Sequence, residues 1–183
     1  YLESCYHQPC YLASVSPIVS KIIETRYGRK ATVLSNGIDT DFYYPGKKNN
    51  DSTILLVGNP FLDFKGFDVA IRALCMVKAA GYDFKVTWVC QTKPSIDELP
   101  FPIEYIVGAP QAQLAEAYRI SDVFMFTSWY EGFGMPPLEA MASGVPVVTT
   151  ACGGIQSYVR PGFNALVAEP GDANALASSL LYL

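Results

Sequence analysis

The sequence predicts an α/β fold built on a doubly wound parallel sheet, and two features of the chain indicate it. Short runs of nearly continuous apolar residues alternate with segments whose apolar residues recur at helical spacing. Such apolar runs are typical of strands that are buried on both faces. Strands that alternate with helices form right-handed βαβ units, which place the strands parallel within one sheet.

The expected strands are short and rich in β-branched and aromatic residues, and turn residues separate them from the helical segments. They are residues 31–35, 53–57, 85–90, 103–107, 122–127, 145–150 and 165–168.

The expected helices lie between these strands. Ser16 and Pro17 supply an N-cap and a first-turn proline for a helix that ends at Gly28. A second helix has its apolar stripe within residues 67–77 and ends by Gly81. Three more are expected at residues 114–118, 136–143 and 173–180.

Residues 36–50 interrupt this alternation. They contain Asn-Gly, Pro-Gly and a Lys-Lys-Asn-Asn run, which are turn and linker chemistry. We therefore expect residues 1–45 to be the end of a preceding domain and its linker, and residues 46–183 to be a second domain. The chain starts with Tyr1 rather than Met and ends in a helical pattern without a terminator. This predicts a piece of a longer chain, with the second domain incomplete at its C-terminal end.

The composition excludes several classes of function. The net charge is −4 and the Lys and Arg residues are scattered, which argues against a nucleic-acid partner. A small anionic ligand remains compatible, because backbone amides can bind it. The five cysteines contain no C-x-x-C pair, as expected of reduced thiols in a cytoplasmic protein. No apolar run reaches the ~18 residues that span a bilayer.

The stretch "EGFGMPPLE" carries the clearest candidate site. It follows the strand expected at residues 122–127, so it lies at the carboxyl edge of the sheet, where such folds bind ligands. Gly132 and Gly134 let an anion approach the backbone closely. The amides of Phe133, Gly134 and Met135 precede a helix whose first turn contains two prolines, so they are free to bind that anion.

Two carboxylates, Glu131 and Glu139, bracket this stretch. Glu139 can offer two acceptor oxygens to a vicinal diol such as a ribose, and Glu131 faces the same pocket. The spacing indicates a ligand with a phosphate in the middle and hydroxyl-bearing rings on both sides. The alternative is that Glu131 caps a turn and Glu139 only favours the first turn of a helix.

Three segments resemble a known family. They are "NGIDTDFYYP", "LLVGNPFLDFKGFDVAIRAL" and "SWYEGFGMPPLEAMASGVPVVTTACGGIQSYVRPGFNALVAEPGD", and they cover most of the chain in order. They resemble the donor-binding half of the retaining glycosyltransferases of family four (glycosyl transferases group 1). That family has the GT-B fold of two Rossmann-like domains, and residues 1–35 resemble the end of its acceptor domain.

The resemblance implies roles for individual residues. Glu139 would hold the ribose hydroxyls and Glu131 the transferred sugar, while the amides of residues 133–135 would hold the diphosphate. Lys65 would stabilise the departing diphosphate, which makes Lys65 and Glu131 the implied catalytic residues. Gly58 and Asn59 match the donor-binding Gly-Arg of the family, with asparagine in place of the usual arginine.

The implied activity is a hexosyltransferase of class EC 2.4 that acts in polysaccharide biosynthesis. It would transfer a sugar from a UDP- or GDP-sugar to a glycan or lipid-linked acceptor, with retention of configuration. The resemblance implies no cofactor and no metal, so Asp39-Thr40-Asp41 is expected to be a linker turn. It leaves room for peripheral contact with the cytoplasmic face of a membrane.

Two alternatives to an active transferase follow from the residues. Asn59 and Ser157, each at a position where the family usually has a charged residue, suggest a nucleotide-sugar-binding module that is catalytically inactive. A nicotinamide-dependent oxidoreductase would need G-x-G-x-x-G after the first strand of the sheet, and "LLVGNPFLDFKG" does not supply it. Because the acceptor residues of the family lie mostly before Tyr1, this chain alone is expected to bind donor without efficient turnover.

Overall fold

The computed structural model describes residues 2–48, 51–96 and 98–183. Its centre is a six-stranded sheet with the order β5-β4-β3-β6-β7-β8, in which every neighbouring pair is parallel. This is the strand order of doubly wound dinucleotide-binding sheets, so the predicted fold class is confirmed. The strands are β3 (Thr53–Val57), β4 (Lys85–Cys90), β5 (Ile103–Val107), β6 (Val123–Phe126), β7 (Val147–Thr150) and β8 (Leu166–Ala168).

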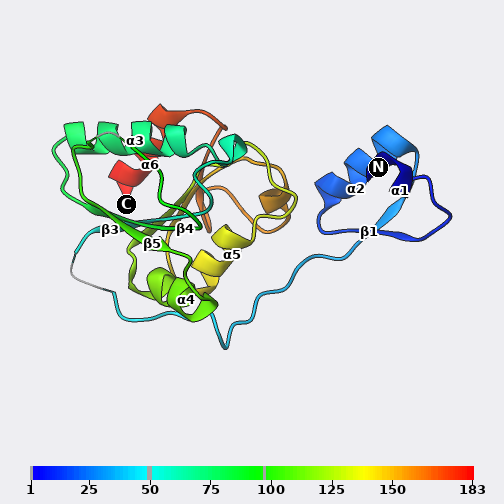
Figure 1. Ribbon diagram of the computed structural model, residues 1–183, viewed down its shortest axis with the longest axis horizontal. Coiled ribbons are helices and arrows are strands. Elements are labelled where there is room, and N and C mark those ends of the chain that lie inside the picture. Colours follow the sequence, from blue (N-terminus) through cyan, green and yellow to red (C-terminus); the bar gives the residue numbers. More distant parts are fainter. Residues whose placement is uncertain (1, 49–50, 97) are drawn as a thin grey trace.

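Helices cover both faces of this sheet (Figure 1). On one face, α3 (Phe67–Ala79) and α6 (Ala173–Tyr182) pack over a core that includes Leu56 and Trp88. On the other face, α4 (Gln111–Ile120) and α5 (Met135–Ala142) pack over Leu55 and Phe124. Adjacent residues of β3 therefore point into different cores, which is why the central strands read as unbroken apolar runs.

The N-terminal part is a separate βαβ unit. Strands β1 (Leu12–Ser14) and β2 (Ala31–Val33) form a two-stranded parallel sheet, joined by α2 (Pro17–Tyr27), and a short helix α1 (Leu2–Cys5) precedes them. As predicted, Ser16 caps α2 and Gly28 ends it in the left-handed conformation, with φ at 63°. Figure 1 shows this unit in blue, beside the larger sheet.

The predicted elements agree most closely with the structure in the half of the sheet formed by β3, β4 and β5. The strands expected at 53–57, 85–90 and 103–107 match to the residue, and the other observed strands are one or two residues shorter than expected. The sequence did not reveal α1, β1 or the two 3-10 turns η1 (Asp63–Lys65) and η2 (Gly154–Ser157). Each is four residues or fewer, too short for a period to show.

Within residues 34–48, the described chain forms neither helix nor strand, yet it is not detached from the larger sheet. Ile38, Phe42 and Tyr43 join the core beneath α4, and the side chain of Tyr43 is only 3% exposed. The linker therefore packs against the six-stranded sheet. The division into domains at 1–45 and 46–183 stays a prediction.

The helices of the described residues include none that is both long and apolar enough to cross a membrane.

Candidate functional site

The candidate site lies at the switch point of the sheet. β3 and β6 are neighbours at its centre, and the chain leaves them toward opposite sides. In such sheets the carboxyl ends of these two strands flank the ligand crevice. The segments that follow β3 and β6 carry Lys65 and Glu131, so the topology alone brings together two residues that are 66 positions apart.

Lys65 reaches this crevice because its loop is fastened to the end of β6. The Thr127 hydroxyl donates to the Lys65 carbonyl at 3.0 Å, and the Trp129 amide donates to the Phe64 carbonyl at 2.7 Å. Gly66 follows in the left-handed conformation, with φ at 64°. A Cβ atom there would lie 2.3 Å from the carbonyl oxygen of Thr127, so only glycine permits this approach.

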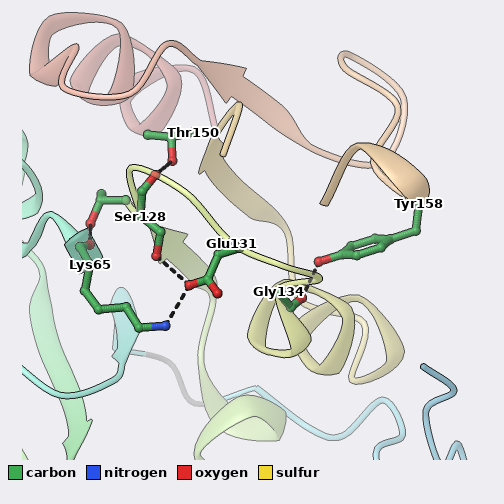
Figure 2. A network of polar contacts seen from close by, with 7 residues as sticks. Lys65, Ser128, Glu131, Gly134, Thr150 and Tyr158 are labelled. Atoms are coloured by element: carbon green, nitrogen blue, oxygen red, sulfur yellow. Dashed lines mark hydrogen bonds and ion pairs between the residues drawn. The ribbon is translucent and has the colours of Figure 1, made fainter. Parts of the chain in front are cut away.

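Lys65 and Glu131 form an ion pair in which Lys65 Nζ lies 2.6 Å from Glu131 Oε1. Their side chains are only 18% and 15% exposed. The Ser128 hydroxyl donates to the same oxygen at 2.9 Å, and Thr150 at the end of β7 donates to the Ser128 carbonyl (Figure 2). Among the described residues, Glu131 Oε2 has no hydrogen-bond partner, so this oxygen is available to a ligand.

The backbone of Glu131 is held by the loop that follows β7. The Glu131 amide donates to the Cys152 carbonyl at 2.7 Å, and the Gly154 amide donates back to the Glu131 carbonyl at 2.9 Å. A Cβ atom on Gly154 would lie 2.2 Å from the Gly132 oxygen and 2.5 Å from the Phe133 nitrogen. The loop therefore packs directly against the peptide units of the candidate phosphate site.

Cys152 itself is not a candidate nucleophile. Burial raises the pKa of its thiol to about 11, so the thiol is protonated at neutral pH. Reactive cysteines have a lowered thiol pKa instead.

The amides of the expected anion site begin α5. Gly134 is the N-cap with φ at 82°, and the Tyr158 hydroxyl donates to its carbonyl (Figure 2). The amides of Phe133, Gly134 and Met135 donate to no other residue in the described part of the chain. The positive end of the helix dipole adds to their partial charge, so the geometry is suited to a phosphate.

Glu139 lies one turn into α5, within a different polar cluster. The Tyr118 hydroxyl on α4 donates to Glu139 Oε2 at 3.0 Å. Burial raises the pKa of Glu139 above its ordinary value, and hydrogen bonds from Tyr118 and Tyr43 counteract part of that rise. Both carboxylates, Glu131 and Glu139, act electrostatically on the Tyr158 hydroxyl, whose pKa is raised mainly by burial. Both acids thus lie close enough to Tyr158 to raise the pKa of its hydroxyl.

Gly58 and Asn59, at the end of β3, have structural roles. The Gly58 amide donates to the Val89 carbonyl at 2.9 Å, and Trp88 Nε1 donates to the Gly58 carbonyl at 3.3 Å. The Asn59 side-chain oxygen accepts from the Phe61 amide at 3.0 Å, which makes an Asx turn. In this structure, Asn59 shapes the loop ahead of Lys65 and forms no contact with the ion pair.

The Asp39-Thr40-Asp41 segment is also a turn. The Asp39 carboxylate accepts from the amides of Asp41 and Phe42 at 3.0 and 3.1 Å. In the described residues, no group of three or more His, Cys, Asp or Glu side chains gathers as metal ligands would.

The sequence did not point to the residues that position these candidates. Four hydroxyl groups donate hydrogen bonds to the predicted site residues or to their neighbours: those of Ser128, Thr150, Tyr118 and Tyr158. Ser128 begins the motif, but its role depends on the turn that brings its hydroxyl back to Glu131. In the sequence, the spacing of Tyr118 places it in the apolar stripe of a helix.

The N-terminal unit also contacts the site, through Ser16. The Ser16 hydroxyl donates to the Gly132 carbonyl at 2.5 Å, across 116 residues, and accepts from the Val19 amide at 3.4 Å. A pocket of about 200 Å³ lies beside this contact, between the start of α2 and the loop at Gly153. The N-terminal unit therefore borders the loop that carries the free amides.

We expect Ser16→Ala to lower the free energy of unfolding by about 1 kcal/mol, because it removes the helix cap together with the bond to Gly132. Urea denaturation followed by circular dichroism measures this loss. Ser178→Ala, on α6, is the matched control, because no hydrogen bond of the Ser178 side chain is present in the described structure. An equal loss in both variants would contradict the assigned role of Ser16.

Sequence relatives are glycosyltransferases. An uncharacterized glycosyltransferase from Methanocaldococcus jannaschii is 27% identical over 174 residues, which cover 92% of this chain and 48% of the relative. D-inositol 3-phosphate glycosyltransferase from Thermobispora bispora is 26% identical over 180 residues, with 84% and 42% covered. This chain thus spans less than half the length of these two relatives.

Solved structures share the fold. Sucrose-phosphate synthase from Thermosynechococcus elongatus superposes with a TM-score of 0.81 at 24% identity, over 99% of this chain and 50% of that one. The Anabaena protein HepE, solved with UDP and glucose, gives a TM-score of 0.80 at 19% identity, over 98% and 55%. At these identities the likeness concerns the fold alone, which is that of GT-B glycosyltransferases.

The family is identified by the sequence itself. The profile of the family described as "Glycosyl transferases group 1" matches residues 51–183, which includes the whole six-stranded sheet and both candidate acids. This chain belongs to the group 1 glycosyl transferase family.

Proposed function

We propose that this chain is the donor-binding half of a glycosyltransferase that transfers a sugar from a nucleoside diphosphate sugar to a glycan or lipid-linked acceptor. One observation carries the proposal. The Lys65–Glu131 ion pair and the free amides at the start of α5 lie on adjoining segments at the switch point of the sheet. A cation and an anion-binding helix terminus suit a diphosphate, and a carboxylate with one free oxygen suits a sugar hydroxyl.

In the proposed mechanism the leaving diphosphate gains its negative charge beside these groups. The Lys65 ammonium and the amides of residues 133–135 stabilise that charge, and Glu131 orients the sugar through Oε2. The acceptor hydroxyl enters on the face that the leaving group vacates and gives its proton to the departing diphosphate, while the bond between the sugar and the diphosphate breaks, so configuration is retained. Charge compensation comes from the protein, so the proposal needs no metal ion or cofactor.

We further propose UDP as the first nucleotide to test, because HepE, a structural neighbour, was solved with UDP-glucose. The transferred sugar, a hexose in this proposal, would come from that donor. The 183-residue chain should bind donor but transfer poorly, since the acceptor residues belong to the other half of the protein. Contact with the cytoplasmic face of a membrane would arise through a lipid-linked acceptor. A binding module without turnover is the alternative, but the named relatives are transferases.

Calorimetry of the purified chain with UDP, GDP and ADP tests the donor site. One nucleotide should bind, and Glu139→Gln should weaken it tenfold or more, because a charged hydrogen-bond acceptor is lost. Glu104→Gln, on the exposed surface of β5, is the matched control and should bind normally. Binding should persist in EDTA. A folded chain that binds none of the three nucleotides would contradict the proposal.

The same titration has an expected pH dependence. Burial raises the pKa of Glu139, and only the ionised carboxylate keeps both oxygens as acceptors, one for the Tyr118 hydroxyl and one for the ribose hydroxyls. Donor affinity should therefore be full above that raised pKa and fall as the pH is lowered through it.

A further inference from the structure

Three segments of the chain meet at the carboxylate of Glu139. The Tyr118 hydroxyl, on α4, donates to Glu139 Oε2 at 3.0 Å. Tyr43, from the linker, lies edge-on to the Tyr118 ring, with 6.0 Å between ring centroids and 72° between ring planes. Both tyrosines are almost fully buried, at 0% and 3% exposure. The carboxylate on α5 is thus fixed by α4 and by the linker, and not by its own helix.

Burial explains why the tyrosines need a partner but not why the partner is an acid. A buried hydroxyl costs free energy unless it is hydrogen-bonded. A backbone carbonyl or a neutral amide would satisfy it without the cost of a half-buried charge. An acid is needed only if something else uses its second oxygen. In the described residues the side-chain hydrogen bonds to the Glu139 carboxylate come from Tyr118, at Oε2, and from Tyr43, which leaves acceptor capacity on the carboxylate for a ligand.

Holding one oxygen also reduces the entropy that a ligand must overcome. A free glutamate side chain loses up to about 2 kcal/mol of rotamer freedom when it is ordered. Here the hydrogen bond from Tyr118 has already ordered it before any ligand binds. Pre-ordering of this kind increases affinity, because binding no longer includes the cost.

We propose that Tyr118 is a positioning residue for the nucleotide, which holds Oε2 of Glu139 so that Oε1 faces the hydroxyls of the bound ribose. Tyr43 supports Tyr118 and makes the linker a part of the donor site. The inference rests on the proposed function, because it assumes that Glu139 binds the nucleotide. It goes further by assigning the binding geometry to two residues outside the glutamate motif.

The electrostatics of the cluster support this arrangement. The titratable groups that act on Glu139 are Tyr118 on α4, Tyr43 in the linker and Tyr158 after η2. Burial raises the pKa of Glu139, and the hydroxyls of Tyr118 and Tyr43 lower it. In turn, burial and the charge of Glu139 raise the pKa of Tyr118 well above its usual value. Removing the Tyr118 hydroxyl should therefore raise the pKa of Glu139 further.

The test compares Tyr118→Phe with Tyr105→Phe, a control that removes a hydroxyl from β5 on the other face of the sheet. Nucleotide affinity is measured by calorimetry between pH 5 and pH 8. Tyr118→Phe should weaken binding at pH 7 about five- to twentyfold. It should also move the acid-side loss of affinity to higher pH, which a merely structural role would not do. Tyr105→Phe should change neither quantity.

A second variant keeps the test decisive if Tyr118→Phe unfolds. Tyr43→Phe removes a hydroxyl from the linker and leaves the bond between Tyr118 and Glu139 in place, and it should shift the pH profile in the same direction by a smaller amount. NMR titration of the Glu139 carboxyl group measures the same shift directly in each folded variant.

The outcomes separate this inference from the proposed function. Wild-type affinity and an unchanged pH profile in both tyrosine variants, with Glu139→Gln still weakening binding, would overturn the inference and leave the function standing. If Glu139→Gln binds nucleotide normally, the proposed function fails instead, and the role of Tyr118 fails with it.

Discussion

Neutralising one member of the Lys65–Glu131 pair is expected to cost more stability than neutralising both. Each single variant, Lys65→Met or Glu131→Gln, leaves the opposite charge mostly buried without its partner. Breaking a fully buried pair costs about 3–5 kcal/mol, and partial exposure reduces this here to about 2 kcal/mol. The double variant removes both charges together and should lie within about 1 kcal/mol of the wild type.

The measurement is a double-mutant cycle in urea. The coupling free energy between the two residues should reach about 1–3 kcal/mol, as found for residues in direct contact. The exposed Lys85–Asp51 pair, at 2.9 Å, is the matched control. Its own double-mutant cycle should give no measurable coupling, since exposed pairs contribute little. Purely additive losses at Lys65 and Glu131 would show that their contact does not stabilise the fold.

Activity, unlike stability, should not recover in the double variant. In the complete protein, either single variant should lower kcat about 10²- to 10³-fold, as loss of one charge-stabilising group does in other enzymes. The double variant should be no better, because restoring charge balance does not restore a group that stabilises the leaving diphosphate. A double variant that recovers both stability and transfer would contradict the catalytic assignment of both residues.

The central strands could be predicted from the sequence because burial determines them. β3 and β4 lie inside the sheet and are almost wholly buried, and their apolar runs have definite ends. β5 is an edge strand with no buried residue, and it was found from its β-branched and aromatic residues between turn residues. β1 could not be predicted, since it is three residues long and only its last residue is buried. A strand that short carries no period.

The strand order could not be predicted, although the parallel sheet could. Local patterns indicate that strands are buried, but not which two are neighbours. The contact between Lys65 and Glu131 depends on β3 lying next to β6, which is a property of the whole topology. The resemblance to the family assigned both residues to one donor site, and the structure shows that they form an ion pair there.

The sequence pointed to the acids of the candidate site but not to the residues that hold them in place. Glu131 and Glu139 stand out because charges flank a glycine-rich turn. Ser128 and Tyr118 do not stand out, because the sequence does not distinguish a hydroxyl that donates to a carboxylate from one that is exposed to water. The expected donor contact of Asn59 stays a prediction, and in this structure its side chain caps a turn. Side-chain partners depend on packing between elements, which no local pattern contains.

The second large effect is expected from Gly154→Ala. A Cβ atom on Gly154 would lie 2.2 Å from the Gly132 oxygen and 2.3 Å from the Gly132 carbonyl carbon. These are backbone atoms, so no side chain can turn away to make room. The loss should be about 3 kcal/mol in the free energy of unfolding, at the upper end for an overpacked site.

Gly37→Ala is the matched control, because a Cβ atom on Gly37 would meet nothing within 4 Å. That variant should be neutral, or slightly stabilising through the reduced entropy of its unfolded chain. Both variants are compared by urea denaturation and by nucleotide calorimetry.

Binding should suffer in Gly154→Ala beyond the loss of stability, because the methyl group pushes on the peptide unit whose nitrogen is the Phe133 amide. If that amide binds the diphosphate, the folded variant should bind nucleotide at least tenfold more weakly, as expected when a hydrogen bond to a charged group is lost. A folded variant that is destabilised but binds normally would place the diphosphate away from this peptide. The amides of Gly134 and Met135 and the Lys65 ammonium would then remain as its ligands, and the loop after β7 would serve only to hold Glu131.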